Sequence, residues 1–117
     1  MSADIRVRRV YEEPSADDGS RVLVDKLWPR GLSKDDAHFD EWAKDVAPSN
    51  ELRTWFGHDP ARFDEFRHRY ERELSAPAAK EGIDHLRGLA AKGTLTLLTS
   101  TREVNVSHAV VLADLLR

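Results

Sequence analysis

The spacing of hydrophobic positions predicts three strands, with turn-forming residues between the first two. Residues 5–10 (IRVRRV) alternate apolar and charged side chains, the period-two pattern of a strand with one buried face. Residues 21–28 (RVLVDKLW) and 94–100 (TLTLLTS) are more continuously apolar, and each is expected to form a further strand. Residues 12–20 (EEPSADDGS) predict an exposed loop. Pro29 lacks a backbone N–H, so the second strand should end before it.

Most of the middle of the chain is predicted to be helical. A first helix should start near residue 34, with Ser33 as its cap, and end before Pro48. Its apolar face would carry Phe39, Trp42, Ala43 and Val46. Ser49 is a good N-cap for a helix over 50–56, and Asp59 followed by Pro60 predicts the start of a helix over 61–74. Further helices are expected over 78–92, ending at Gly93, and over 105–117.

This element order, β-β-α-α-α-α-β-α, predicts an α/β fold. A long helical excursion between two strands is typical of a crossover that joins parallel neighbours. We therefore expect a small, mostly parallel three-stranded sheet flanked by helices. The loop at 12–20 leaves open whether the first two strands are parallel or antiparallel. Residues 1–117 contain no repeat and no dividing linker, so we expect one domain.

Composition narrows the classes of function. The chain has 117 residues with no cysteine, which excludes disulfides, thiolate catalysis and iron–sulfur clusters. Eighteen basic and 21 acidic residues give a net charge of −3, without the basic excess of most nucleic-acid-binding proteins, so nucleic acid is a disfavoured partner. With no long apolar run and no signal-peptide core, we expect a cytoplasmic protein without a membrane partner.

Polar side chains gather directly after the second and third expected strands. In open parallel sheets, ligands bind beyond the carboxyl ends of the strands, so these two segments should share one cleft. The later segment also opens the last expected helix, whose N-terminus favours an anion. The candidate ligand-binding residues in the two segments are Trp28, Arg30, Ser100, Arg102, Asn105 and Ser107.

The residue types in this expected cleft suggest a small anionic ligand. Arg30 and Arg102 would hold a phosphate or carboxylate. Asp25 and His108 are the candidate catalytic residues, which would make acid–base or orienting contacts. Trp28 could form part of the pocket wall. If the site is catalytic, hydrolysis or group transfer on a phosphorylated or carboxylated substrate fits best.

Each of these residues also has a plainer structural interpretation. Asp25 could cap the following turn or pair with Arg30, and Arg102 with Glu103 could form a solvated pair of little energetic value. His108 could be a hydrogen-bonded helix residue, and Trp28 could simply pack against the rim of the core. A competing hypothesis is a non-catalytic interaction domain, either a homodimer or a nucleic-acid-associated accessory protein, which tryptophans exposed beside an apolar patch would favour.

No cofactor or metal is expected from the sequence. The five histidines lack metal-ligand spacing, and neither a GxxxxGK[ST] loop nor a GxGxxG loop is present. Ser100 does not lie in a GxSxG elbow, so the sequence gives no support for a serine hydrolase.

Three segments resemble a known family over nearly the entire chain. They are LVDKLWPRGLSKDD (residues 23–36), WAKDVAPSNELRTWFGHDPARFDEFRHRY (42–70) and TLLTSTREVNVSHAVVLADLL (96–116). Their VD(R/K)LWPRG and APSxELRxWFGHDP blocks are similar to those of the YeaO-like branch of a bacterial and archaeal domain family of unknown function. The resemblance implies a small α/β domain with a Rossmann-like core, and it implies no particular reaction.

The resemblance also bears on individual site residues. The broader family carries an Asp and a nearby Arg after one strand, which Asp25 and Arg30 match. A Cys-His-Arg triplet tends to open its last helix, and here only His108 of that triplet is present. Thr99 stands where YeaO-like relatives commonly have a tyrosine, while Arg102-Glu103 keeps their basic–acidic pair. A thiol-dependent role is therefore impossible in this chain.

Overall fold

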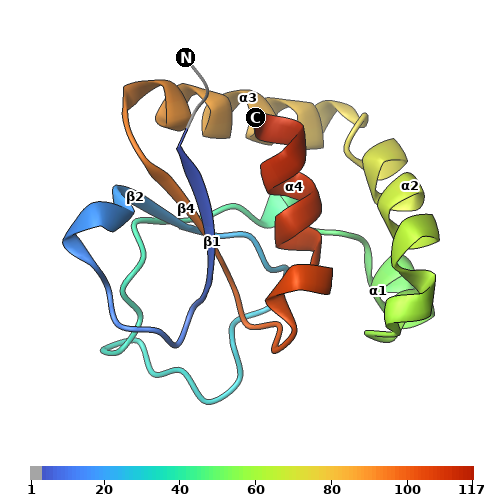
Figure 1. The fold of residues 1–117 in the computed structure, drawn as a ribbon, viewed down its shortest axis with the longest axis horizontal. Helices are drawn as coiled ribbons and strands as arrows, with labels where there is room; N and C mark the ends of the chain where they lie inside the picture. The colour runs from blue at the N-terminus through green and yellow to red at the C-terminus, as the bar shows by residue number, and fades with distance from the viewer. Residues whose placement is uncertain (1–3) are drawn as a thin grey trace.

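The strands form one parallel sheet in the computed structural model, which describes residues 4–117. The spatial order is β1-β4-β2-β3. These strands are β1 (Ile5–Arg9), β2 (Ser20–Leu23), β3 (Glu41–Trp42) and β4 (Leu95–Thr99). Every neighbouring pair is parallel, so the carboxyl ends of β1, β4 and β2 meet at one edge of the sheet (Figure 1).

Four α-helices accompany the sheet. They are α1 (Asn50–Phe56), α2 (Phe63–Glu73), α3 (Pro77–Lys92) and α4 (His108–Leu116). In Figure 1, α4 lies alongside β1, which it contacts, and α2 and α1 lie farther to the right, beyond α4. The predicted caps are confirmed for α1, where the Ser49 hydroxyl accepts a hydrogen bond from the Leu52 amide at 3.1 Å. Asp59 and Pro60 open a short 3-10 turn that leads into α2.

Both faces of the sheet are covered, and this explains why β2 and β4 read as continuous apolar runs. Val22 and Leu97 point into a large core that the helices complete. Leu23 and Leu98 point to the opposite face, into a smaller cluster. The loop after β2 and the residues that follow it cover this second cluster with Leu32, Phe39 and Trp42.

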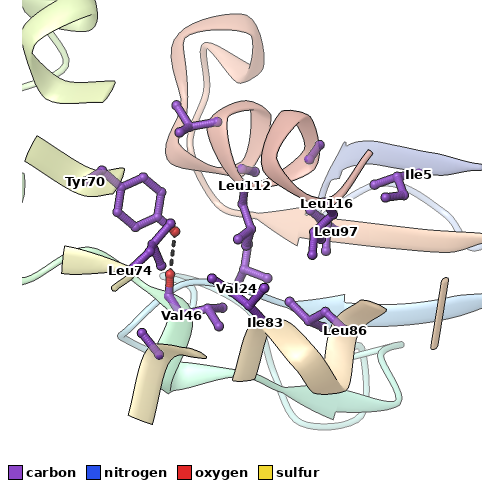
Figure 2. Close-up of a cluster of buried hydrophobic side chains, with 14 of the residues drawn as sticks. Ile5, Val24, Val46, Tyr70, Leu74, Ile83, Leu86, Leu97, Leu112 and Leu116 are labelled. Atoms are coloured by element: carbon purple, nitrogen blue, oxygen red, sulfur yellow. Dashed lines mark hydrogen bonds between the residues drawn. The ribbon is translucent and has the colours of Figure 1, made fainter. Parts of the chain in front are cut away.

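The large core joins the helices to the sheet (Figure 2). Tyr70 of α2 is fully buried, and its hydroxyl donates a hydrogen bond to the carbonyl oxygen of Val46. Burial raises the pKa of this phenol, so it remains a neutral donor. The bond ties α2 to the segment before α1, and α1 and α2 form one side of the site described below.

The helix expected from residue 34 to 46 is wrong. Ser33 does cap a turn, since its hydroxyl accepts from the Asp36 amide at 3.2 Å, but that turn does not continue as a helix. The chain instead pairs with the outer side of β2: Asp40 and Ala43 donate backbone hydrogen bonds to Arg21 and Leu23, both at 2.8 Å. The resulting two-residue β3 makes the sheet four-stranded, where the sequence predicts three strands.

Two other boundaries are corrected. The second strand was expected to reach residue 28 but ends at Leu23, because the chain turns away from the sheet after Val24, whose amide still bonds Leu98 at 3.0 Å. The last helix was expected from residue 105, but 104–106 form a 3-10 turn and α4 starts at His108. The expected crossover between parallel neighbours is confirmed, since β2 and β4 pair in parallel. The open orientation is settled too, because β1 also pairs in parallel with β4.

Candidate functional site

A cleft of about 890 Å³ opens at the carboxyl edge of the sheet. Side chains from three segments line it: residues 25–30 after β2, residues 100–103 with 107–108 between β4 and α4, and residues 48–58 around α1, to which Phe66 of α2 adds. The first two are the segments that the sequence places together. The third comes from the helical part of the chain, and no pattern in the sequence predicts that it joins them.

The cleft is rich in cationic side chains. Lys26, Arg30, Arg53 and Arg102 all line it and are all exposed. Across residues 4–117, none of these four forms an ion pair with a carboxylate. The plainer pairings of Arg30 with Asp25 and of Arg102 with Glu103 are therefore not formed in the described part of the chain. Unpaired guanidinium groups on a concave wall can bind an anion.

Arg30 is positioned by a turn at the rim. The Leu32 amide donates to the Pro29 carbonyl at 3.3 Å, and Gly31 has a φ of 76°, a left-handed conformation that glycine adopts without strain. The Tyr11 hydroxyl donates to the carbonyl oxygen of Arg30 at 2.7 Å. The turn and the Tyr11 hydrogen bond thus fix the backbone of Arg30, from which its side chain extends.

Asp25 is buried at the base of the cleft, with both carboxylate oxygens occupied. One oxygen accepts from the Thr99 hydroxyl at 2.7 Å and lies 3.2 Å from Nε2 of His108. The other accepts from the amide and from the hydroxyl of Ser100, each at 2.8 Å. Asp25 therefore joins the end of β2 to the end of β4 and to the first residue of α4.

These contacts set the charge of Asp25. Burial by itself raises the pKa of this carboxyl, but the hydrogen bond and charge of His108, the Ser100 amide and the Thr99 hydroxyl together outweigh it. The net result lowers the pKa of Asp25 from 3.8 to about 2. Asp25 is ionised at neutral pH and has no free proton to donate, so the geometry suits an orienting contact better than general acid catalysis.

His108 is the first residue of α4 and lines the cleft. Its Nε2 lies 3.0 Å from the Val24 carbonyl oxygen as well as close to Asp25. Both neighbours are acceptors, so Nε2 must carry a hydrogen and donate. The Tyr70 ring packs edge-on against the imidazole at 6.0 Å. These contacts match the plainer interpretation of a hydrogen-bonded helix residue, and they hold the α4 N-terminus at the cleft.

The remaining expected site residues differ in their positions. Ser100 and Ser107 line the cleft, and the buried Ser107 hydroxyl donates to the Val104 carbonyl at 2.7 Å. Trp28 lines the cleft and is 37% exposed. Asn105 is exposed in the 3-10 turn before α4 and lies outside the cleft lining.

Two further side chains in the cleft carry chemistry that the sequence analysis did not assign to the site. Arg53 stands on α1, where its guanidinium donates to the Asn50 side chain at 3.3 Å. His58 follows the end of α1 and has a φ of 57°, in the left-handed region that side chains rarely adopt. Nothing in the local sequence marks this conformation, because φ is visible only in the structure.

Within residues 4–117, no group of three or more His, Cys, Asp or Glu side chains is placed to hold a metal ion. In the same part of the chain, no helix combines the length and apolar character needed to cross a bilayer.

Comparisons with known proteins agree with the resemblance noted from the sequence motifs. An uncharacterized protein of Mycobacterium tuberculosis (strain ATCC 25618 / H37Rv) is 54% identical over 112 residues, which cover 96% of this chain and 92% of the relative. The uncharacterized protein YeaO of Escherichia coli (strain K12) is 45% identical over 114 residues, 97% of each chain. No solved structure matches this chain.

The family comparison covers the same part of the molecule as the structure. The DUF488-N3i family, described as the inactive DUF488-N3 subclade, matches residues 4–117, which include all three walls of the cleft. Together with the similarity to YeaO over the full length, this match shows that the chain belongs to the DUF488-N3i family of YeaO-like proteins.

Proposed function

We propose that this protein binds a small anionic ligand, bearing a phosphate or a carboxylate, in the cleft at the carboxyl edge of its sheet, and does not transform it. The observation that carries the proposal is the position of Arg30 and Arg102. They are 72 residues apart in the sequence, yet both line one cleft. Among residues 4–117 neither is neutralised by a carboxylate, so both guanidinium groups are free to bind an anion.

Two nearby features support an anion. Lys26 and Arg53 add positive charge to the same walls, and α4 begins at the cleft with the positive end of its dipole. The acidic groups are fewer. Asp25 is buried and bound by donors from three residues, which leaves Glu103 as the exposed carboxylate in the lining.

Two observations support binding without catalysis. The family to which the chain belongs is described as inactive. In addition, the carboxylate of Asp25 is committed to Thr99, Ser100 and His108, and Nε2 of His108 is committed to Asp25 and Val24. This pair orients the loops, and neither the Asp25 carboxylate nor Nε2 of His108 is free to exchange a proton with a ligand. The parallel strands that border the cleft also support the Rossmann-like core, which we propose as the finer description of the fold.

A thermal-shift screen tests the proposed function. The ligands would be inorganic phosphate, sugar phosphates, nucleotides and small carboxylates, and the proteins wild type, Arg30→Ala and Arg102→Ala. Arg72→Ala is the matched control, because Arg72 is exposed on α2 outside the cleft. A ligand at about 100 times its Kd should add about 2.7 kcal/mol to the stability of the wild type, a shift of about 10 °C in Tm.

The pattern across the variants decides the outcome. The shift should be retained in Arg72→Ala and strongly reduced in both cleft variants. Equal shifts in all four proteins would place the anion elsewhere, and no shift with any anion would contradict the proposed function.

A further inference from the structure

Trp28 is both exposed and rigidly held, a combination that a merely structural role does not require. Its side chain is 37% exposed and lines the cleft. The indole N–H donates to the Leu32 carbonyl at 2.6 Å, so the polar edge of the ring is already satisfied within the chain. The rest of the ring is apolar aromatic surface, and it lines the same cleft as Arg30.

Other aromatic rings fix the orientation of Trp28. Phe39 lies with its ring centroid 5.7 Å away in a tilted arrangement, and Trp42 lies 5.6 Å away in an edge arrangement. Trp42 is itself anchored, since its N–H donates to the Asp25 carbonyl at 2.6 Å. Trp28 is therefore positioned through the same residue that joins β2 to β4, and binding a ring there costs little side-chain entropy.

The remaining apolar walls suit an organic anion better than a bare inorganic one. Leu27, beside Trp28, is 60% exposed, and Pro48 and Phe56 face the lining from the α1 side. The volume of about 890 Å³ falls in the range of pockets that take whole organic ligands. An inorganic phosphate would bind the arginines and leave this apolar surface in water.

Resting on the proposed anion site, we propose that the ligand joins its phosphate to a flat aromatic ring, which stacks on Trp28 while Arg30 and Arg102 hold the phosphate. Aryl phosphates and nucleoside monophosphates share this chemistry. An aromatic ring has a π-face that an indole recognises by stacking, whereas a saturated ring of the same size does not. Trp28 is then the residue that determines specificity, and the arginines provide the charge.

Isothermal titration with three probes separates charge from stacking. Phenyl phosphate has both a ring and an anion, cyclohexyl phosphate has a saturated ring of similar size, and inorganic phosphate has the anion alone. Wild type should bind phenyl phosphate about tenfold more tightly than either other probe, a difference typical of one stacked ring. Trp28→Leu should lose this preference and keep its affinity for inorganic phosphate. Adenosine monophosphate then shows whether the site accepts a nucleoside.

Trp55→Leu is the matched control for the loss of a tryptophan. Trp55 lies on α1 outside the cleft lining, where Arg62 and Arg69 cover its ring. This variant should keep the full preference for phenyl phosphate. If Trp28→Leu does not fold, the wild type alone still gives an answer: bound phenyl phosphate should show upfield-shifted ring protons in its NMR spectrum, caused by the indole ring current.

The outcomes distinguish the two proposals. Equal affinities of wild type for phenyl and cyclohexyl phosphate would overturn stacking and leave the anion site intact. A wild type that binds none of the probes would overturn both. A wild-type dimer by light scattering that becomes a monomer in Trp28→Leu would also overturn stacking, because it would assign Trp28 to an interface between two copies of the chain.

Discussion

Asp25 is the residue on which the geometry of the cleft depends most. The carboxylate accepts hydrogen bonds from two residues at the end of β4 and from the first residue of α4, and its own backbone carbonyl accepts from Trp42. The ionised side chain of Asp25 thus holds two loops and one helix together, and its backbone carbonyl holds the aromatic cluster. This role explains why an acidic residue lies buried in a cleft whose exposed charges are mainly positive.

The first prediction concerns how the stabilisation by the ionised Asp25 side chain depends on pH. The pKa of Asp25 is lowered in the folded protein to about 2, so the ionised form stabilises the fold at every pH above its ordinary value. The contribution, about 2 kcal/mol at neutral pH, should disappear as the pH falls from about 4 to about 2. Urea unfolding of wild type and Asp25→Asn across this range measures it.

Asp35→Asn, at an exposed turn position, is the control and should match wild type at each pH. Wild type should exceed Asp25→Asn by about 2 kcal/mol near pH 7, and the two should converge near pH 2. A stability difference that stays constant with pH would show that the charge of Asp25 is not what holds the loops.

His58 gives the second prediction at this scale. Its left-handed φ costs a side chain with a β-carbon about 1–2 kcal/mol, which glycine avoids at some cost in chain entropy. We expect His58→Gly to raise the free energy of unfolding by about 0.5 kcal/mol. The same substitution at the exposed His68, inside α2, should lower it by about 0.4 kcal/mol, the difference in helix propensity between histidine and glycine. Chemical denaturation that gives both variants the same sign would refute the strain assigned to His58.

Sequence reasoning located part of the site because Asp25, Arg30 and Arg102 directly follow strands, and strand ends of a parallel sheet share one edge. It did not find Arg53 or His58. Their place in the cleft depends on how α1 packs beside α2 and α4, and no local pattern encodes that contact. For Asp25 and His108 the sequence leaves open whether their contacts are catalytic or structural, because their partners lie 74 to 84 residues away in the chain.

At the scale of elements, the predictions were accurate wherever local signals were strong. Ser49 and the 3.6-residue spacing identified α1, α2 and α3 to within a few residues. The helix over 34–46 failed because Phe39, Trp42 and Val46 happen to repeat at helical spacing. In the structure Phe39 and Trp42 cover the second face of the sheet, while Val46 enters the main core. Residues that pack into two different clusters therefore have the same spacing as one apolar face of a helix. A two-residue strand such as β3 forms by pairing with a distant strand, and it is too short to show an alternating hydrophobic pattern in the sequence.

Packing of α3 provides a prediction at the element scale. A β-carbon on Gly82 would lie 2.7 Å from Cγ1 of Val46, which is fully buried and cannot move aside freely. A β-carbon on Gly88 would meet nothing within 4 Å. Gly88→Ala should therefore stabilise the protein by about 1 kcal/mol through helix propensity. Gly82→Ala should lower its stability by about 1–3 kcal/mol through overpacking.

Thermal or urea unfolding compares the two variants directly. Each substitution is the control for the other, because both place alanine inside the same helix. Equal stabilisation by both would show that α3 does not press against the turn that contains Val46.

At the scale of the whole molecule, charge is unevenly distributed. The chain carries a net charge of −3, yet four lysines and arginines and only two carboxylates line the cleft. Burial of Asp25 removes one of those carboxylates from solvent. An anion that approaches the molecule therefore finds its favourable potential at the carboxyl edge of the sheet, and added salt should weaken binding there.

The central claim is that three separate segments form one anion site. A phosphate titration of the ¹⁵N-labelled protein, followed through the backbone amide signals, tests it most directly. Signals from residues 26–31, 53–58 and 100–109 should shift together and saturate with one common Kd, while those of β1 and the C-terminal half of α3 stay in place. Shifts confined to a single segment, or segments that titrate with different constants, would contradict a shared cleft.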